Sequence, residues 1–331
     1  MEKLFINWEN VKRAKGSRCM KVLITGINGF AASHLARFLL DKGYEVHGTV
    51  RVRSDLHRIK DIKNNMQLHY VELSDTISIN NLLLELKPDE IYHLAAQSFV
   101  KSSWEAPIET YTTNVLGTVS LLECVRNTCT AKVVVTSTSE VYGDQKGILN
   151  EVTPPTPNTH YGVSKFSQDM IARLYADVYG MDVVVTRSFN ITGAGRADVF
   201  VDSNFCKQIA EMEKYEEVDN ILCHGNLESA RDFTDITDVV KGYYLAMKKG
   251  IAGEVYCFCR EEPTKIQDLL NLMLKHAKVD VRTEIDKSRF RPVDTATMIG
   301  DCSKAKALGW KVTVPLEQSI IELLNYWRAR V

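Results

Sequence analysis

The chain has 331 residues, which is enough for two lobes around a shared cleft and for a large buried core. Lys and Arg number 41 against 42 Asp and Glu, so the formal charge is −1, and hydrophobic residues make up 45%. Proteins that neutralise nucleic-acid phosphates usually carry a basic domain, and disordered chains contain much less apolar matter. The composition therefore excludes both classes and predicts a soluble globular protein with no nucleic-acid partner.

No apolar stretch approaches the roughly 18 residues of a membrane span, and residues 1–20 carry charges where a signal peptide would be apolar. We therefore expect no membrane partner and a cytoplasmic location. The eight cysteines include no CxxC pair, and Cys257 and Cys259 alternate along the apolar run 255–259, which is typical of a strand. We expect reduced packing thiols rather than a redox or metal site, and we predict no metal.

The first elements are an apolar run at 20–25 that ends in Gly26 and a segment at 30–41 with helical spacing of apolar residues. They predict a strand, a tight turn and a helix. Further strands are predicted at 45–50, 67–73, 90–94, 132–136 and 182–189, and further helices at 77–86, 106–126 and 160–179. Strands that alternate with helices, several of them uninterrupted by polar residues, indicate a parallel sheet covered on both faces. The predicted fold class is α/β, a Rossmann-type doubly wound parallel sheet.

The character of the sequence changes after Asn190, where Gly193 and Gly195 lead into short mixed elements and a loop-like stretch at 286–294. We interpret this part as a smaller C-terminal substrate-binding lobe at the carboxyl edge of the sheet, where ligands of such folds bind. The predicted division is an N-terminal extension at 1–19 without a core pattern, a Rossmann domain at 20–190, and a lobe formed mainly by 191–331. This division leaves open that the chain returns to the sheet within 191–331.

A glycine-rich turn joins the first strand to the first helix and reads Thr25-Gly-Ile-Asn-Gly-Phe-Ala-Ala32. Gly26 permits the tight turn, Gly29 lets the backbone approach a pyrophosphate, and the last alanine is small enough for the helix to pack on the strand. Backbone amides at the start of such a helix face an anion. The turn, with Gly26, Asn28, Gly29 and Phe30, is therefore predicted to bind a dinucleotide.

The second strand ends in Val50-Arg-Val-Arg-Ser54, with no carboxylate before Asp55. A protein that binds NAD usually offers an acid at this point to the ribose 2′-hydroxyl, whereas guanidinium groups suit the 2′-phosphate of NADP. The alternative is two solvated arginines on a loop. We predict that Arg51 and Arg53 bind NADP in preference to NAD.

The sequence Tyr161-Gly-Val-Ser-Lys165 opens a predicted helix, so its tyrosine and lysine lie on one face, one turn apart. A phenol with a pKa near 10 is a poor base at neutral pH, and an adjacent ammonium lowers that pKa by favouring the phenolate. The pair is therefore predicted to act as a general base and its activator.

The strand at 132–136 runs into Ser137-Thr-Ser-Glu-Val-Tyr-Gly143, which a parallel sheet places at its carboxyl edge beside the nucleotide. Hydroxyls there can bond a sugar, and Glu140 can act as a general base or acid. A hydroxyl-rich strand end by itself is more often a turn or a cap. Because it occurs together with the glycine turn and the tyrosine–lysine pair, we predict a catalytic set of Thr138, Glu140, Tyr161 and Lys165.

In these motifs the chain resembles the extended short-chain dehydrogenase/reductases, and within them the enzymes that modify GDP-sugars. The resemblance runs from Met20 to the C-terminus. Its specific pieces are HLAAQS at 93–98, YGVSK at 161–165, GNLESARDFTD at 225–235, RFRP at 289–292 and LGWK at 308–311. The chain is most similar to the GDP-mannose 4,6-dehydratases and next to the GDP-4-keto-6-deoxy-mannose reductases.

The resemblance implies oxidation of a sugar at C4, loss of water across C5 and C6, and return of the hydride to C6. By the family pattern Tyr161 takes the proton of the C4 hydroxyl, Glu140 takes the C5 proton and assists loss of the C6 hydroxyl, and Thr138 holds the C4 oxygen. Lys165 tunes the tyrosine and binds the nicotinamide ribose.

The resemblance also implies contacts to both ligands. Cofactor contacts are implied at Glu72, Leu73, Leu94, Ala95 and Ala96, in addition to Tyr161 and Lys165. Substrate contacts are implied at Ser98, Asn190, Arg231 and Arg291. The two arginines would grip the diphosphate with planar forks of donors. Members of the family commonly assemble as homo-dimers or homo-tetramers through helices of the nucleotide-binding domain.

Three alternatives remain open. The first is a reductase. Such dehydratases commonly show a histidine after the Phe-Asn pair, but here Ile191 follows. This stretch, together with 199–209 and 226–235, is similar to the reductases. A related nucleotide sugar is a second alternative, and a non-catalytic NADP or nucleotide-sugar sensor is a third. The pair Thr138 and Glu140 favours the dehydratase, because a reductase needs no base at C5, and an intact catalytic set argues against a sensor.

Overall fold

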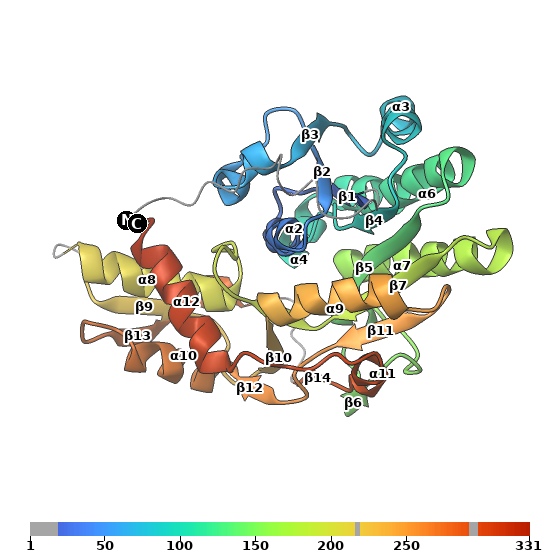
Figure 1. Ribbon diagram of the computed structural model, residues 1–331. Helices are drawn as coiled ribbons and strands as arrows, with labels where there is room; N and C mark the ends of the chain where they lie inside the picture. Colours follow the sequence, from blue (N-terminus) through green and yellow to red (C-terminus); the bar gives the residue numbers. More distant parts are fainter. Residues whose placement is uncertain (1–18, 216–218, 291–296) are drawn as a thin grey trace.

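The structure is a computed structural model that describes residues 19–215, 219–290 and 297–331 (Figure 1). The predicted N-terminal extension, apart from its last residue, and the predicted substrate residue Arg291 lie outside the described residues.

A seven-stranded sheet forms the centre of the molecule, in the order β11-β7-β5-β4-β1-β2-β3. Every neighbouring pair is parallel, which confirms the predicted doubly wound α/β fold. The strands are β1 (Lys21–Thr25), β2 (Glu45–Val50), β3 (Gln67–Tyr70), β4 (Glu90–His93), β5 (Lys132–Thr138), β7 (Val183–Ser188) and β11 (Val255–Phe258).

Valine runs explain the central strands. In β5, Val133 and Val135 pack into one hydrophobic cluster while Val134 packs into another, and all three are fully buried. Each cluster lies on one face of the sheet, so an uninterrupted β-branched run is stable only because both faces are covered.

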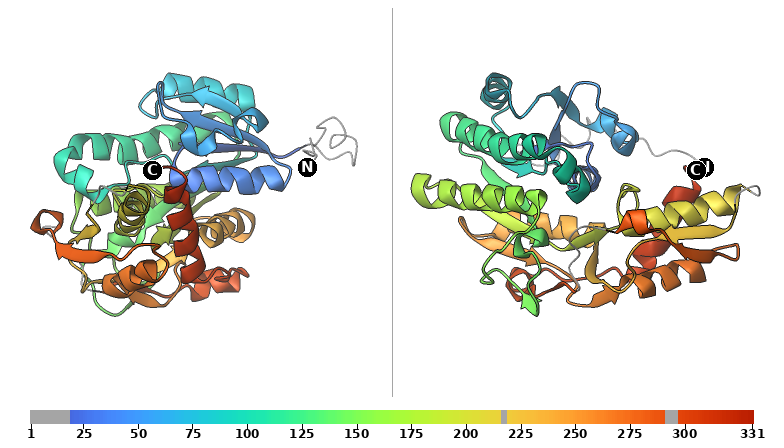
Figure 2. Two further views of the ribbon diagram at one scale, coloured as in Figure 1. Left: turned by 90° about the vertical axis from the view of Figure 1, so that its left-hand side faces the viewer. Right: turned by 180° about the vertical axis from the view of Figure 1, so that it is seen from behind.

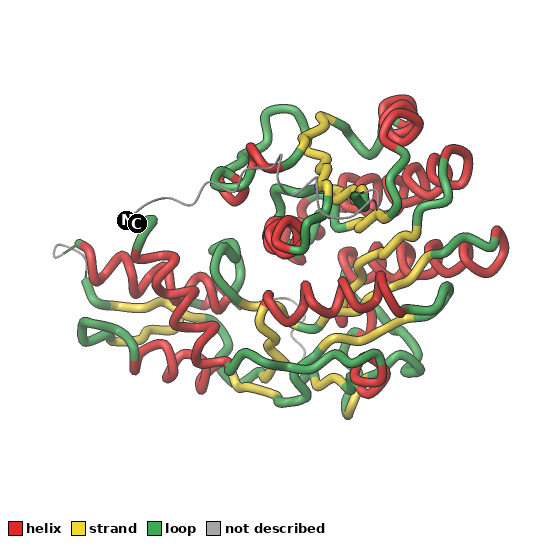
Figure 3. The backbone as a smooth tube through the Cα atoms, viewed as in Figure 1, coloured by secondary structure: helices red, strands yellow, loops and turns green. Residues whose placement is uncertain are grey.

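Helices cover the two faces, as Figures 1 and 3 show. One layer consists of α3 (Thr76–Leu86), α6 (Gly117–Thr128) and α7 (His160–Tyr179), and the other of α2 (Phe30–Asp41) and α9 (Ile236–Lys249). The bounds of α2 and α7 agree with the prediction from helical spacing.

The long helix predicted at 106–126 is wrong in detail, because the chain forms α4 (Val100–Glu105), α5 (Pro107–Tyr111) and a π-helical turn (Thr112–Leu116) before α6. The π-turn carries the fully buried Asn114. Its side chain accepts from Gln97 N at 2.8 Å and donates to Ser164 Oγ at 2.9 Å. The extra backbone residue of a π-turn is a common way to aim such a side chain inward.

The remaining elements form a smaller lobe in which α8, α10 and α12 pack together at one end of the molecule, away from α3 (Figure 2). The lobe consists of β8 (Asn190–Thr192), α8 (Val201–Lys214), β9 (Ile221–His224), β10 (Ala230–Asp235), β12 (Pro263–Lys265), α10 (Ile266–Lys275), β13 (Arg282–Ile285) and α12 (Leu316–Arg328). Three short elements, β6 (Ile148–Leu149), β14 (Ile299–Gly300) and α11 (Ser303–Ala307), lie beside the β11 end of the sheet.

The chain does cross back to the sheet after residue 190. It leaves the sheet at the end of β7 and returns as α9 and β11, with β11 at the edge beside β7. No helix among the described residues is long and apolar enough to cross a membrane.

Candidate active site

The glycine turn has the geometry of a dinucleotide site. Gly26 has φ +66°, and a Cβ there would lie 2.9 Å from the Cα of Ala95, so only glycine fits. The amide of Gly29 donates to the carbonyl of Gly26 at 2.9 Å and closes the turn. Gly29 is also the N-cap of α2 and makes no side-chain cap, so the first helical amides can serve an anion. This cradle fits the pyrophosphate of a dinucleotide.

A buried hydroxyl chain positions the neighbouring loop. The Oγ1 of Thr25 accepts from the amides of Leu94 and Ala95, both at 3.1 Å, and lies 2.8 Å from His93 Nδ1. His93 Nε2 lies 3.0 Å from Thr118 Oγ1, and that hydroxyl donates to a backbone carbonyl. The histidine must therefore carry its proton on Nε2. Burial lowers the pKa of His93 to about 3, so the ring is neutral.

The predicted NADP arginines line a cavity of about 360 Å³ together with Val52, Ser54, Tyr70 and Glu72. Arg51 and Arg53 are exposed, and Arg53 has φ +63°, an uncommon conformation for a residue with a side chain. Their two guanidinium groups give this cavity donors for a phosphate. Leu73 is mostly buried and its side chain packs where α6 begins at Gly117.

The four predicted catalytic residues come from two adjacent elements. Thr138 ends β5, and its hydroxyl accepts from the amide of Glu140 at 3.3 Å, which starts a short 3₁₀ turn. Helix α7 begins at His160, so Tyr161 and Lys165 lie in its first turns. The side chains of Thr138 and Tyr161 are hydrogen-bonded. Burial and the nearby charge of Glu140 both raise the pKa of Tyr161 above its usual value.

Two protein acceptors hold the ammonium of Lys165 in this structure. Its ammonium donates to the carbonyl of Thr136 at 2.5 Å and to the side-chain oxygen of Gln168. Burial lowers the pKa of Lys165 to about 7, and burial also dominates the raised pKa of Tyr161. Burial is the largest cause of both shifts, and the pKa of Tyr161 is raised rather than lowered.

Two residues near the tyrosine were missed by the sequence analysis. The charge of Arg196 lowers the pKa of Tyr161, and Tyr243 also acts on it. Arg196 is buried, pairs with Asp202 at 2.9 Å, and lies 4.0 Å from the ring centre of Phe200. No local spacing connects these residues to Tyr161, because they come from other parts of the chain.

The predicted substrate residues are only partly brought together. Asn190 is in β8 and Arg231 in β10, and the two strands pair with Asn190 opposite Phe233. The buried Arg231 donates from Nη1 to the carbonyl of Ala230 at 2.9 Å. Ser98 is exposed in the loop after β4. The roles of these residues stay predictions.

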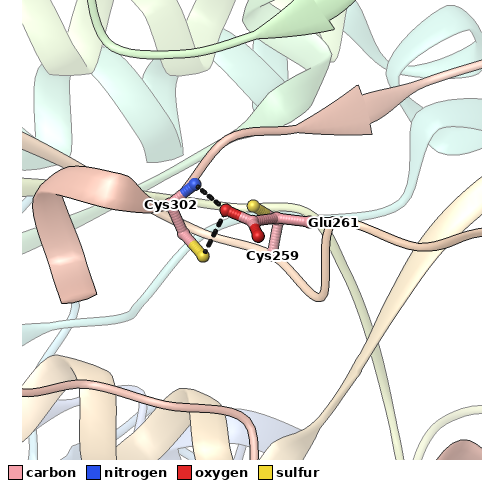
Figure 4. Close-up of side chains that lie close together, drawn as sticks. All are labelled: Cys259, Glu261 and Cys302. Atoms are coloured by element: carbon pink, nitrogen blue, oxygen red, sulfur yellow. Dashed lines mark hydrogen bonds between the residues drawn. The ribbon is translucent and has the colours of Figure 1, made fainter.

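One cluster among the described residues brings three potential metal ligands within 4.8 Å of one another, namely Cys259, Glu261 and Cys302 (Figure 4). The Oε1 of Glu261 accepts from the amide and the thiol of Cys302, at 3.0 and 3.1 Å, and its Oε2 pairs with Lys306. Protein donors thus already occupy the carboxylate, and the cluster is satisfied as a hydrogen-bonded group. The absence of a metal stays a prediction.

The fold and the glycine turn, together with the tyrosine–lysine pair on α7, define an extended short-chain dehydrogenase/reductase. The family model described as GDP-mannose 4,6 dehydratase matches residues 23–323. The chain belongs to this family, which confirms the resemblance found in its motifs.

Individual relatives point to two activities. The chain is 33% identical over 316 residues to GDP-mannose 4,6 dehydratase 1 of Arabidopsis thaliana, covering 90% of this chain and 87% of that protein. It is 29% identical over 316 residues to GDP-6-deoxy-D-mannose reductase of Pseudomonas aeruginosa, covering 94% and 98%. The solved structure of RMD from Pseudomonas aeruginosa complexed with NADPH superposes with a TM-score of 0.81 at 28% identity, covering 94% and 100%.

Proposed function

We propose that this protein is a GDP-mannose 4,6-dehydratase that uses NADP⁺ and releases GDP-4-keto-6-deoxy-mannose and water. The observation that carries the proposal is the convergence of Thr138, Glu140 and Tyr161 where β5 ends and α7 begins. A carboxylate close to the catalytic tyrosine supplies a base for the C5 proton. Elimination needs such a base, and reduction of a ketone does not.

The side chains of the site handle the protons of the reaction. When bound, NADP⁺ supplies an acceptor for the C4 hydride and the donor that returns it to C6. Tyr161 takes the C4 hydroxyl proton, and Thr138, which is hydrogen-bonded to it, holds the C4 oxygen. Once C4 is a ketone, Glu140 takes the acidic C5 proton and gives a proton to the departing C6 hydroxyl. Tyr161 gives up the proton it took and one proton is added at C5, so the sugar loses one water and both the enzyme and the cofactor are regenerated.

Two features support NADP⁺ as the cofactor. The cradle at Gly26 and Gly29 fits a pyrophosphate, and the cavity lined by Arg51 and Arg53 offers two cations to a 2′-phosphate. Both lie at the nucleotide half of the sheet, on the loops after β1 and β2.

The test is incubation with GDP-mannose and catalytic NADP⁺ without a reductant, followed by mass spectrometry. We expect a product lighter by one water, and deuterium at C5 when the reaction is run in D₂O. Absence of this product overturns the proposal for this substrate.

The reductase is the second candidate, because the reductase relative from Pseudomonas aeruginosa covers 94% of the chain. Consumption of NADPH with GDP-4-keto-6-deoxy-mannose, and no dehydration of GDP-mannose, would favour it. Binding of NADP⁺ with neither reaction would favour the sensor.

We also propose a homo-dimer or homo-tetramer built on the outer surface of α4, α5 and α7. Several large apolar side chains are exposed there: Trp104, Ile108, Met170, Leu174 and Val178. On α7 the last three are spaced four residues apart and form one stripe. Exposed apolar patches of this kind usually mark an interface. A monomeric mass in light scattering at micromolar concentration would refute this assembly.

A further inference from the structure

A fully buried glutamine, Gln168, lies one turn beyond Lys165 on α7 and holds its ammonium. Its side-chain oxygen accepts from Lys165 Nζ, and the carbonyl of Thr136 accepts from the same nitrogen at 2.5 Å. The two acceptors belong to rigid elements, α7 and β5. An ammonium has three donors, so two of them are committed to described protein acceptors in fixed positions.

The orientation of the carboxamide follows from this contact. The ammonium form of Lys165 has donors only, so it is the oxygen of Gln168 rather than its nitrogen that faces Nζ. The Nε2 of Gln168 consequently finds no hydrogen-bond partner among the described protein atoms. A buried donor without a partner costs free energy. Among the described residues, the contact with Lys165 is therefore the hydrogen bond that this side chain makes.

Three titratable groups surround Lys165, and Gln168 is the neutral side chain that accepts a hydrogen bond from it. His93 faces Lys165 from β4 and is neutral, because burial and, to a smaller extent, the lysine charge together lower its pKa to about 3. Asp169 raises the pKa of Lys165, but it is itself paired with Arg187 of β7 at 2.7 Å. Tyr161 lies one turn earlier on α7 and is buried.

We propose that Gln168 is a positioning residue whose neutral carboxamide holds the Lys165 ammonium in place for the nicotinamide ribose and Tyr161 without forming an ion pair. The role of Lys165 toward the cofactor rests on the proposed function. The contact between Lys165 and Gln168 does not, so the two can fail separately.

The test replaces Gln168 by two side chains of similar size. Q168E supplies a carboxylate, and Q168M supplies no strong acceptor. The titration of Lys165 is followed in ligand-free protein by NMR of ¹³C-ε-lysine, with its resonance assigned by comparison with K165M. We expect the titration midpoint to rise in Q168E and to fall in Q168M, each by about one unit or more.

A merely structural role would lower the melting temperature of both variants without moving the two midpoints in opposite directions. Midpoints that stay unchanged, or that move in the same direction, overturn the proposal. If Q168E does not fold, Q168M decides alone, because the proposal requires its midpoint to fall. The matched control is S167A on the same helix, whose hydroxyl bonds only the carbonyl of Val163 and whose loss should leave the midpoint unchanged.

A second readout is the pH dependence of NADPH affinity, measured by fluorescence. The pH above which binding weakens should move with the Lys165 midpoint, upward in Q168E and downward in Q168M. A wild-type protein that binds NADPH but does not dehydrate GDP-mannose would refute the proposed function while leaving this inference standing.

Discussion

Replacing Arg51 and Arg53 together by alanine is expected to weaken NADP⁺ binding and to leave NAD⁺ binding unchanged. Both arginines are exposed and line one cavity with Ser54 and Tyr70. NAD⁺ and NADP⁺ differ only in the 2′-phosphate, so the difference between the two affinities isolates the phosphate contact.

The magnitude follows from the exposure of these side chains. A charge-assisted contact of an exposed guanidinium is screened by solvent, and each is worth about 1 to 1.5 kcal/mol. Two contacts contribute about 2 to 3 kcal/mol. At about 1.4 kcal/mol per factor of ten, the NADP⁺ dissociation constant should rise about 30- to 150-fold.

The assay is isothermal titration calorimetry with both dinucleotides at one ionic strength. The matched control is Lys60→Ala, which removes a positive charge from the adjoining cavity lined by Asp55 and His57. We expect this control to change NADP⁺ affinity by no more than about twofold, because solvent and salt screen separated surface charges.

Two results would refute the reasoning. A loss of less than about threefold in the double variant would place the 2′-phosphate elsewhere. A parallel loss of NAD⁺ affinity would mean that the arginines support the loop and do not bind the phosphate.

Three further predictions concern the catalytic acid, an internal histidine and a buried ion pair. Glu140→Gln should lower kcat for dehydration at least about 100-fold with NADP⁺ affinity unchanged, and lost cofactor binding would mean that the residue is misplaced. The folded protein holds His93 neutral, so the contribution of this residue to the free energy of unfolding is fully present above pH 6.5 and is lost toward pH 3. Between pH 7.5 and pH 5 the wild type should therefore lose about 2 kcal/mol more unfolding free energy than His93→Gln, as measured by urea denaturation, and equal losses would contradict this. Arg187→Met leaves Asp169 buried without its partner and should cost about 3 to 5 kcal/mol, whereas adding Asp169→Leu should restore part of that loss; no recovery would show that the two charges are not coupled.

Much of the fold could be predicted because its signals are local. The valine run of β5 and the helical spacing of α2 and α7 are complete within each segment, and the predicted bounds of both helices agree with the structure. The helix predicted at 106–126 failed where a long-range contact intervened. Asn114 reaches Gln97 and Ser164, and the backbone adopts a π-turn that no helical periodicity indicates.

The candidate site likewise contains local motifs that the sequence showed and distant residues that it did not show. The glycine turn and the pair Tyr161 and Lys165 each lie within one local unit, so their spacing was readable. Arg196 and Tyr243 act on Tyr161 from distant segments, and no spacing in the chain indicated them.

Local patterns in the chain were enough to predict the alternation of strands and helices as far as β7, apart from the broken helix at 106–126. They were also enough for the glycine turn and the spacing of Tyr161 and Lys165, because these depend on residues a few positions apart. The pKa of Lys165, in contrast, depends on the packing of the whole fold. Folding removes water from its ammonium, and this lowers its pKa to about 7. Folding also brings Thr136 and Gln168 to the same ammonium as hydrogen-bond acceptors. Desolvation depends on everything packed around a group, and neighbours in the sequence supply only part of that environment.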